Sequence, residues 1–314
     1  MLPPSREDIQ LIARNSDWRT ADIADTLRRD VYAKPSDWRR LLEYLLLGAG
    51  ASCLLSGIFF FFAYNWAALS SALKIGIAVS CFTAAALAGL YAPLPRLPRL
   101  VAHTAAVCLI GAVLAVLGQV YQTGANAYDL FLVWSLLSLP WVMAVPFAPL
   151  YLVAIVVYNL TFVTYTQQVG VELSFLVTGM LLFGFNILCW LILWSRFRNR
   201  PSFQWLLQLV AFWSVIVATI NVSAGAYDDR PRQLLFTVLF AGLVYVGWIL
   251  LALRERSIFY LALVGGGSLV TVTFLLLRWA DFLNSFLLAG LLVLVGVTGL
   301  VQVLNRLNRR WHHE

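Results

Sequence analysis

The sequence predicts an all-α fold: a polytopic membrane helix bundle with about ten transmembrane helices and a short cytoplasmic N-terminal helical segment. First, 61% of the 314 residues are hydrophobic and only 12% are charged, which is more apolar surface than a water-soluble domain buries. Second, apolar runs long enough to cross about 30 Å of hydrocarbon recur along the chain. Third, basic residues gather in alternate connections between these runs, as is typical of cytoplasmic loops.

The first predicted unit, residues 1–40, mixes seven acidic with eight basic residues, too much charge for a cleavable signal peptide. Its apolar residues recur at roughly helical spacing, which predicts a cytoplasmic amphipathic helical segment. Two interpretations stay open: a cap on the inner face of the bundle, or a docking site for a cytosolic partner. The tetrapeptide Ser-Asp-Trp-Arg occurs at 16–19 and at 36–39, and each copy predicts a helix N-cap.

Residues 41–304 form the predicted transmembrane bundle, and residues 305–314 form a basic cytoplasmic tail. A helix rises about 1.5 Å per residue, so about twenty apolar residues cross the hydrocarbon. Three prolines, at 140, 146 and 149, leave open whether residues 130–166 form two helices or a broken segment. The predicted spans are residues 43–64, 72–92, 101–121, 130–147, 149–166, 172–194, 203–222, 233–253, 257–277 and 282–303.

The distribution of basic residues predicts the orientation of these spans. If the N-terminus is cytoplasmic, the inner ends of the spans and the inner loops, counted from Arg39 onwards, carry twelve basic residues, whereas the outer loops carry four: Lys74, Arg230, Arg232 and Arg278. The positive-inside rule then predicts ten crossings with both termini in the cytoplasm.

The chain lacks the sequence patterns that mark catalytic, cofactor or metal sites. Its four cysteines lie within apolar runs without metal-ligand spacing, and it has no HExxH, GxSxG or phosphate-binding glycine loop. Basic residues stand at the ends of apolar runs, so we expect no nucleic-acid partner. The predicted mid-membrane region holds Asn159 and Asn186 but almost no ionisable group, which argues against an ion-coupled pump.

Polar residues concentrate at the predicted outer ends of the spans, most densely in the segment GQVYQTGANAYDLF at 118–131. Gln119 and Tyr121 precede the loop, where a lipid-facing polar atom is unsatisfied, so we expect both to face protein. These residues predict either an outward-facing polar pocket or a set of helix caps and solvated loops. The candidate ligand-binding or partner-binding residues are Asn65, Trp66, Lys74, Gln119, Tyr121, Gln122, Asn126, Tyr128, Asp129, Glu172, Asp228 and Arg230.

Two segments, residues 57–76 and 118–141, resemble the signature segments of an uncharacterised bacterial membrane-protein family, domain-of-unknown-function family 2157. The first contains Asn-Trp at 65–66 and a lysine at 74; the second contains Gly-Gln-x-Tyr-Gln-x-Gly at 118–124 and Leu-Phe-x-x-Trp at 130–134. The resemblance is best over residues 40–145. It implies a bacterial inner membrane and a neighbourhood of other envelope proteins.

The main hypothesis is an integral inner-membrane protein whose outward-facing polar cavity binds or transports an amphiphile or small molecule. The first alternative is a non-transporting subunit of an envelope membrane-protein complex, which the resemblance favours over a solitary enzyme. The second, less favoured, is a metal-dependent enzyme on lipid-linked substrates that uses Asp129, Glu172, Asp228 and Asp229. Expected partners are the lipid bilayer, an envelope membrane protein, and a lipid or small-molecule ligand.

The predicted orientation can be tested with single cysteines in a variant that lacks the four native ones. A membrane-impermeant thiol reagent added to intact cells should label Asn126→Cys, whereas Arg198→Cys should react only after the membrane is permeabilised. Labelling of position 198 but not of position 126 in intact cells would reverse the orientation.

Overall fold

The computed structural model describes residues 6–32, 34–65, 69–169, 173–278 and 282–313. Ten helices within these ranges are long and apolar enough to cross a membrane, and no strand occurs in them. The predicted all-α polytopic bundle is therefore confirmed. The long helices are α3 (Pro35–Asn65), α4 (Ser71–Tyr91), α5 (Arg96–Val120), α6 (Ala127–Ala144), α7 (Ala148–Gln168), α8 (Phe175–Phe197), α9 (Pro201–Gly225), α10 (Pro231–Glu255), α11 (Ile258–Leu277) and α12 (Phe282–His313).

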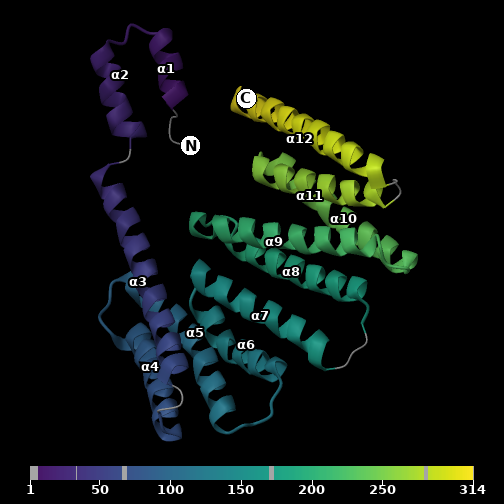
Figure 1. The fold of residues 1–314 in the computed structure, drawn as a ribbon. Coiled ribbons are helices and arrows are strands. Elements are labelled where there is room, and N and C mark those ends of the chain that lie inside the picture. The colour runs from purple at the N-terminus through teal and green to yellow at the C-terminus, as the bar shows by residue number, and fades with distance from the viewer. Residues whose placement is uncertain (1–5, 33, 66–68, 170–172, 279–281, 314) are drawn as a thin grey trace.

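The long helices form an array that runs from α3 and α4 at one side to α11 and α12 at the other, with α7, α8 and α9 between them (Figure 1). Successive helices alternate in direction, so their connections lie at two opposite ends. The arginine-rich end includes the connections at 92–95, 145–147 and 198–200, and the polar end includes those at 121–126 and 226–230. This alternation of helix direction agrees with the position of the basic residues, which lie mainly in every second connection.

The proline-rich region between residues 130 and 166 forms two helices and not a broken segment. α6 continues through Pro140, and the chain leaves helical structure at Val145–Phe147 before α7 begins. Pro149 lies in the first turn of α7, where a missing backbone N–H costs no helical hydrogen bond. The break therefore lies at the arginine-rich end and leaves both helices continuous across the bundle.

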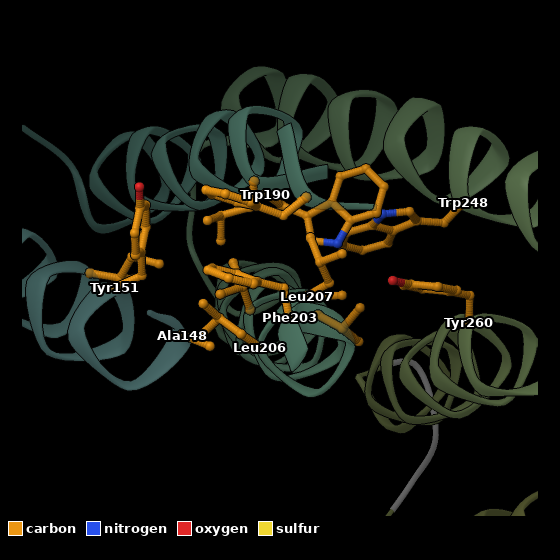
Figure 2. Packing of buried hydrophobic residues seen from close by; sticks show 14 of the residues in the cluster. Ala148, Tyr151, Trp190, Phe203, Leu206, Leu207, Trp248 and Tyr260 are labelled. Carbon is orange, nitrogen blue, oxygen red and sulfur yellow. The ribbon is translucent and has the colours of Figure 1, made fainter. Parts of the chain in front are cut away.

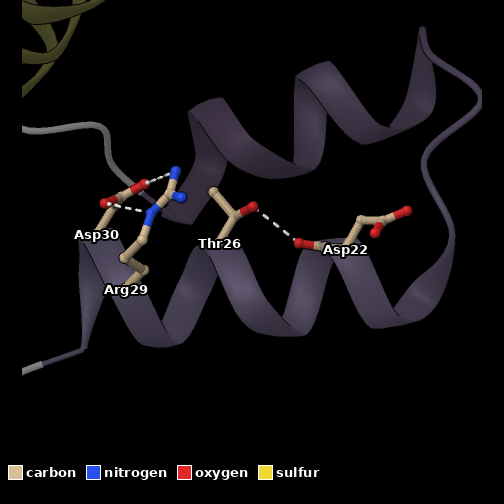
Figure 3. A network of polar contacts seen from close by, with 4 residues as sticks. All are labelled: Asp22, Thr26, Arg29 and Asp30. Carbon is tan, nitrogen blue, oxygen red and sulfur yellow. Dashed lines mark hydrogen bonds and ion pairs between the residues drawn. The ribbon is translucent and has the colours of Figure 1, made fainter.

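The N-terminal segment is a hairpin of two short helices, α1 (Arg6–Arg14) and α2 (Thr20–Thr26), and α2 continues into a π-helical turn, η1 (Leu27–Val31). These elements contact mainly one another, and the hairpin stands beyond the start of α3 rather than over the bundle (Figure 1). In α2 and η1, Thr26 Oγ1 donates to the Asp22 carbonyl at 2.7 Å, and Arg29 pairs with Asp30 at 3.3 Å (Figure 3).

The serines of the repeated Ser-Asp-Trp-Arg tetrapeptide are not the predicted N-caps, although the second copy does lie at the start of the helix that leads into the first span. Ser16 Oγ donates to the Ile12 carbonyl at the end of α1, and the second copy lies inside the first turn of α3. The carboxylates that do cap are at the third helical position. Asp22 accepts from the Arg19 backbone N–H at 3.1 Å, and Asp37 accepts from the Lys34 N–H at 3.0 Å. Side chains at this position reach back to the orphan donors of the first turn.

The largest buried cluster lies where α7 to α11 meet, and its centre is aromatic (Figure 2). The Trp190 ring packs edge-on against Trp248 at 5.7 Å and against Tyr260 at 6.0 Å, measured between ring centroids. Phe197 and Phe203 stack with centroids 4.0 Å apart. Since lipid tails are as apolar as these side chains, close packing and not exclusion from water holds the helices together.

A chain of polar contacts joins α6, α7 and α8 inside the bundle. Asn159 and Asn186 exchange two side-chain hydrogen bonds, at 2.7 and 3.2 Å, and Asn186 is fully buried. Ser135 and Thr161 hydroxyls lie 2.7 Å apart between α6 and α7. The two mid-membrane asparagines therefore satisfy one another, which supports a packing role for both.

We expect Asn186→Leu to lower the free energy of unfolding by about 1–2 kcal/mol, because the Asn159 amide loses its partner on α8. The double variant Asn159→Leu/Asn186→Leu should lose less than the sum of the single variants. Unfolding of the purified protein in mixed detergent micelles measures both. Thr164→Val, which removes a hydroxyl bonded within its own helix, is the matched control. Additive single and double losses would show that the pair is not coupled.

Candidate functional site

The segment 118–131 forms the end of α5, a tight turn and the start of α6. The last turn of α5 closes with Tyr121 N–H donating to the Leu117 carbonyl at 3.0 Å and Thr123 N–H donating to the Gly118 carbonyl at 3.3 Å. Gln122 adopts a φ of 44° and Gly124 a φ of 63°. This left-handed closure is a Schellman-type helix end, in which glutamine occupies the position that glycine usually takes.

The start of α6 is fixed by Asn126 and Asp129. Asn126 is the N-cap residue, and its backbone N–H donates to Asp129 Oδ2 at 3.0 Å. Asp129 also places negative charge in the first turn of α6, where the helix dipole favours it. One carboxylate oxygen of Asp129 therefore caps α6, as expected if the polar residues of this segment are helix caps.

Between these two helix ends lies a groove of about 440 Å³ at the polar end of the bundle. It brings together three of the predicted site residues, Gln119, Asn126 and Asp129, and adds Thr123, which is not among the predicted residues. Below this polar rim the walls are apolar. They are formed by Leu114, Ala115, Leu117, Leu130 and Val133. The groove is therefore amphipathic along its depth.

The expectation that Gln119 and Tyr121 face protein is wrong. Both side chains are exposed, Tyr121 by 67%, and α5 ends at this level. Gln119 still lines the groove, whereas the groove lining includes neither Tyr121 nor Gln122.

Tyr128 points to a different neighbour, the end of α7. Its ring lies 5.1 Å from that of Tyr165, and its backbone N–H donates to Gln168 Oε1 at 2.9 Å. These contacts tie α6 to α7 at the polar end, so Tyr128 supports the groove without lining it. The glutamine pair at 167–168 was visible in the sequence only as a polar helix end, and nothing in its spacing indicated which turn it would meet.

Of the predicted site residues at the ends of the first two spans, the structure describes Asn65 and Lys74. Lys74 lies in the first turn of α4, which packs its Ile75 and Ala78 against Val116 and Val120 of α5. It therefore stands at the same end as the groove. Asn65 is the last residue of α3. Trp66 and Glu172 lie outside the described residues.

Asp228 and Arg230 belong to a separate place, the α9–α10 turn. Arg230 Nε lies 3.9 Å from Asp228 Oδ1, and Arg278 donates to the Ala226 carbonyl in the same turn. Figure 1 shows this turn at a different edge of the array from the α5–α6 turn, with α7 and α8 between them. In the described parts of the chain, no three histidine, cysteine or carboxylate side chains come close enough to hold a metal ion.

Trp134 in the Leu-Phe-x-x-Trp motif sets the spacing between α5 and α6. Its indole Nε1 donates to the Val107 carbonyl at 2.7 Å, and its ring covers Gly111, where any Cβ atom would collide with it. The glycine thus permits the close approach of the two helices that wall the groove.

Replacing Asp129 separates its capping role from its charge. We expect Asp129→Ala to lower the free energy of unfolding by about 1 kcal/mol, because the Asn126 N–H loses its acceptor. Asp129→Asn keeps an acceptor oxygen and should lose less than half as much. Thermal unfolding of the purified variants checks both values. Equal stability of all three proteins would mean that the cap contributes nothing.

Comparison with known proteins agrees with the resemblance seen in the two sequence segments. A family model described as "Predicted membrane protein (DUF2157)" matches residues 17–151. This range runs from the N-terminal hairpin to the start of α7 and includes both walls of the groove. No curated protein and no solved structure matches the chain. The chain is a multi-pass membrane protein that resembles this family over its N-terminal part.

Proposed function

We propose that this membrane protein binds the headgroup of an amphiphile in the groove between α5 and α6. The observation that carries the proposal is the layering of the groove, with Gln119, Thr123, Asn126 and Asp129 at the rim and aliphatic side chains below. A lipid-like molecule has the same layering, since its polar head joins apolar tails. The volume of about 440 Å³ lies in the range of ligand pockets, which is about 300–1,000 Å³.

The rim favours a headgroup that donates hydrogen bonds. Asp129 is the charged residue of the groove lining, and the amides of Gln119 and Asn126 can both donate and accept. A carboxylate beside neutral amides complements an ammonium or a cluster of hydroxyls better than a bare phosphate. An amine-bearing or sugar-bearing lipid is therefore the ligand class that we propose.

Binding without transport is the better-supported form of the proposal. From Asn126 to Val133 the groove follows about 10 Å of α6, about one third of the hydrocarbon thickness. Transporters usually bind substrate near mid-membrane between interrupted helices. Here α6 and α7 are continuous, and the break between them lies at the arginine-rich end. We further propose that the groove faces away from the cytoplasm in a bacterial inner membrane.

The test compares dioleoyl-phosphatidylethanolamine, which has N–H donors, with dioleoyl-phosphatidylcholine, which has none. Native mass spectrometry of the full-length protein in a non-ionic detergent should show a preference for phosphatidylethanolamine. Asp129→Asn should weaken that binding about tenfold, because it removes a charge-assisted hydrogen bond while keeping the helix cap. Gln119→Leu should weaken it as well.

The matched control is Asp228→Asn, which changes an acidic residue in the α9–α10 turn. This variant should bind phosphatidylethanolamine like the wild type. If the Asp129 and Asp228 variants behaved alike, or if the two lipids bound equally to the wild type, the groove would not be the headgroup site.

A further inference from the structure

A second cavity, of about 590 Å³, lies at the arginine-rich end and shares no residue with the α5–α6 groove. Four parts of the chain line it: α3 through Tyr44, the start of α5 through Arg96, the α6–α7 connection through Pro146 and Phe147, and the start of α9 through Ser202 and Trp205. Arg96 and Gln119 stand 23 residues apart on α5, about 35 Å along the helix. The two sites are therefore at opposite ends of the same helix.

The cavity is positively charged, and no carboxylate of its lining offsets this charge. Arg96 is exposed in it, and the ion pairs found between described residues are Arg29 with Asp30 and Arg230 with Asp228. The bordering connections at 92–95, 145–147 and 198–200 contain no Asp or Glu. Glu43, next to Tyr44 on α3, lines a different surface together with Trp38 and Arg39.

Neighbouring arginines are held in other contacts, which leaves Arg96 to face the cavity. The guanidinium of Arg198 lies 4.7 Å from the centre of the Trp194 ring, and those of Arg196 and Arg200 lie 5.7 and 5.5 Å from that of Phe197. Arg99 donates to the Leu94 carbonyl at 3.1 Å. These cations add positive potential around the cavity without filling it.

Helix geometry adds to the same potential. α5, α7 and α9 all begin at the cavity wall, at Arg96, Ala148 and Pro201. Each first turn contains a proline without an N–H (Pro98, Pro149 or Pro201), so each helix start contributes few free backbone donors and mainly the positive end of its dipole. The hydroxyls of Tyr44 and Ser202 are further donors. Donors and positive charge thus converge on one cavity, which suits a phosphate group.

We propose that this cavity binds the phosphate headgroup of an anionic phospholipid. Besides the donors, its lining is apolar, with Leu97, Leu100, Phe147 and Trp205, and Trp205 is 41% exposed. Tyrosine and tryptophan at helix ends are typical of the level where headgroups meet hydrocarbon. Acyl chains can continue along the apolar walls, which a water-soluble phosphate would leave uncovered. Basic pockets between transmembrane helices bind such headgroups.

The test titrates the full-length protein in a non-ionic detergent with dioleoyl-phosphatidylglycerol and follows bound lipid by native mass spectrometry. Arg96→Gln should weaken the tightest site about fivefold, and Arg96→Lys should restore much of the affinity. The matched control is Arg254→Gln, an exposed arginine in the last turn of α10, which should bind like the wild type. Ser202→Glu, which places a carboxylate in the cavity, should weaken binding even if Arg96→Gln is recovered in poor yield.

Three outcomes would overturn the proposal. Unchanged phosphatidylglycerol binding in both Arg96→Gln and Ser202→Glu would show that the cavity is not the site. Equal losses of phosphatidylglycerol affinity in Arg96→Gln and Arg254→Gln would show that the lipid responds only to the overall positive charge of the surface. Displacement of the lipid by equimolar glycerol 3-phosphate, in an Arg96-dependent way, would assign the cavity to a water-soluble phosphate. Asp129→Asn should leave the Arg96-dependent part of this binding unchanged, so the failure of either proposed site is seen separately.

Discussion

Polar groups in hydrocarbon must find hydrogen-bond partners within the protein, and this requirement shapes both the backbone and the placement of polar side chains. It forces the backbone into helices, since only there can each apolar segment satisfy its own N–H and C=O groups. It also explains the side chains that stay polar between the helix ends. Asn159 and Asn186 satisfy one another across α7 and α8, Ser135 meets Thr161 across α6 and α7, and the Trp134 indole uses a carbonyl of α5. Each contact joins neighbouring helices at a defined height.

The same constraint divides the polar residues into two kinds of place. Within the bundle, several of them bond across neighbouring helices, as Asn159 does with Asn186, whereas those at the helix ends are open to ligands as well. At the polar end, Asp129 caps α6 and also lines the α5–α6 groove. At the arginine-rich end, the starts of three helices and Arg96 share one cavity. The proposed headgroup sites therefore lie at the two levels where a bilayer presents headgroups, and their opposite charges suit different lipids.

Not every polar helix end becomes part of a site. Asp228 and Arg230 pair with each other in the α9–α10 turn, and Tyr128 packs on Tyr165 of α7. Sequence patterns alone grouped these residues with Gln119 and Asn126, because all of them follow or precede an apolar run. Their separation comes from the order in which the helices pack, which places α7 and α8 between the two turns (Figure 1).

Hydrophobic length and charge are local properties of each segment, so the sequence predicts the all-α class, the number of candidate spans and the alternation of basic connections. It also indicated the segment 118–131 as the densest polar helix end. Which of those residues lie together depends on how the helices pack. Gln119, Asn126 and Asp129 share a groove, Tyr121 turns outward, and Tyr44, Arg96, Phe147 and Trp205, far apart in the chain, line one cavity. These contacts between distant residues follow from the packing of helices such as α5, α7 and α9 against one another. The spacing of residues within a single helix does not predict them.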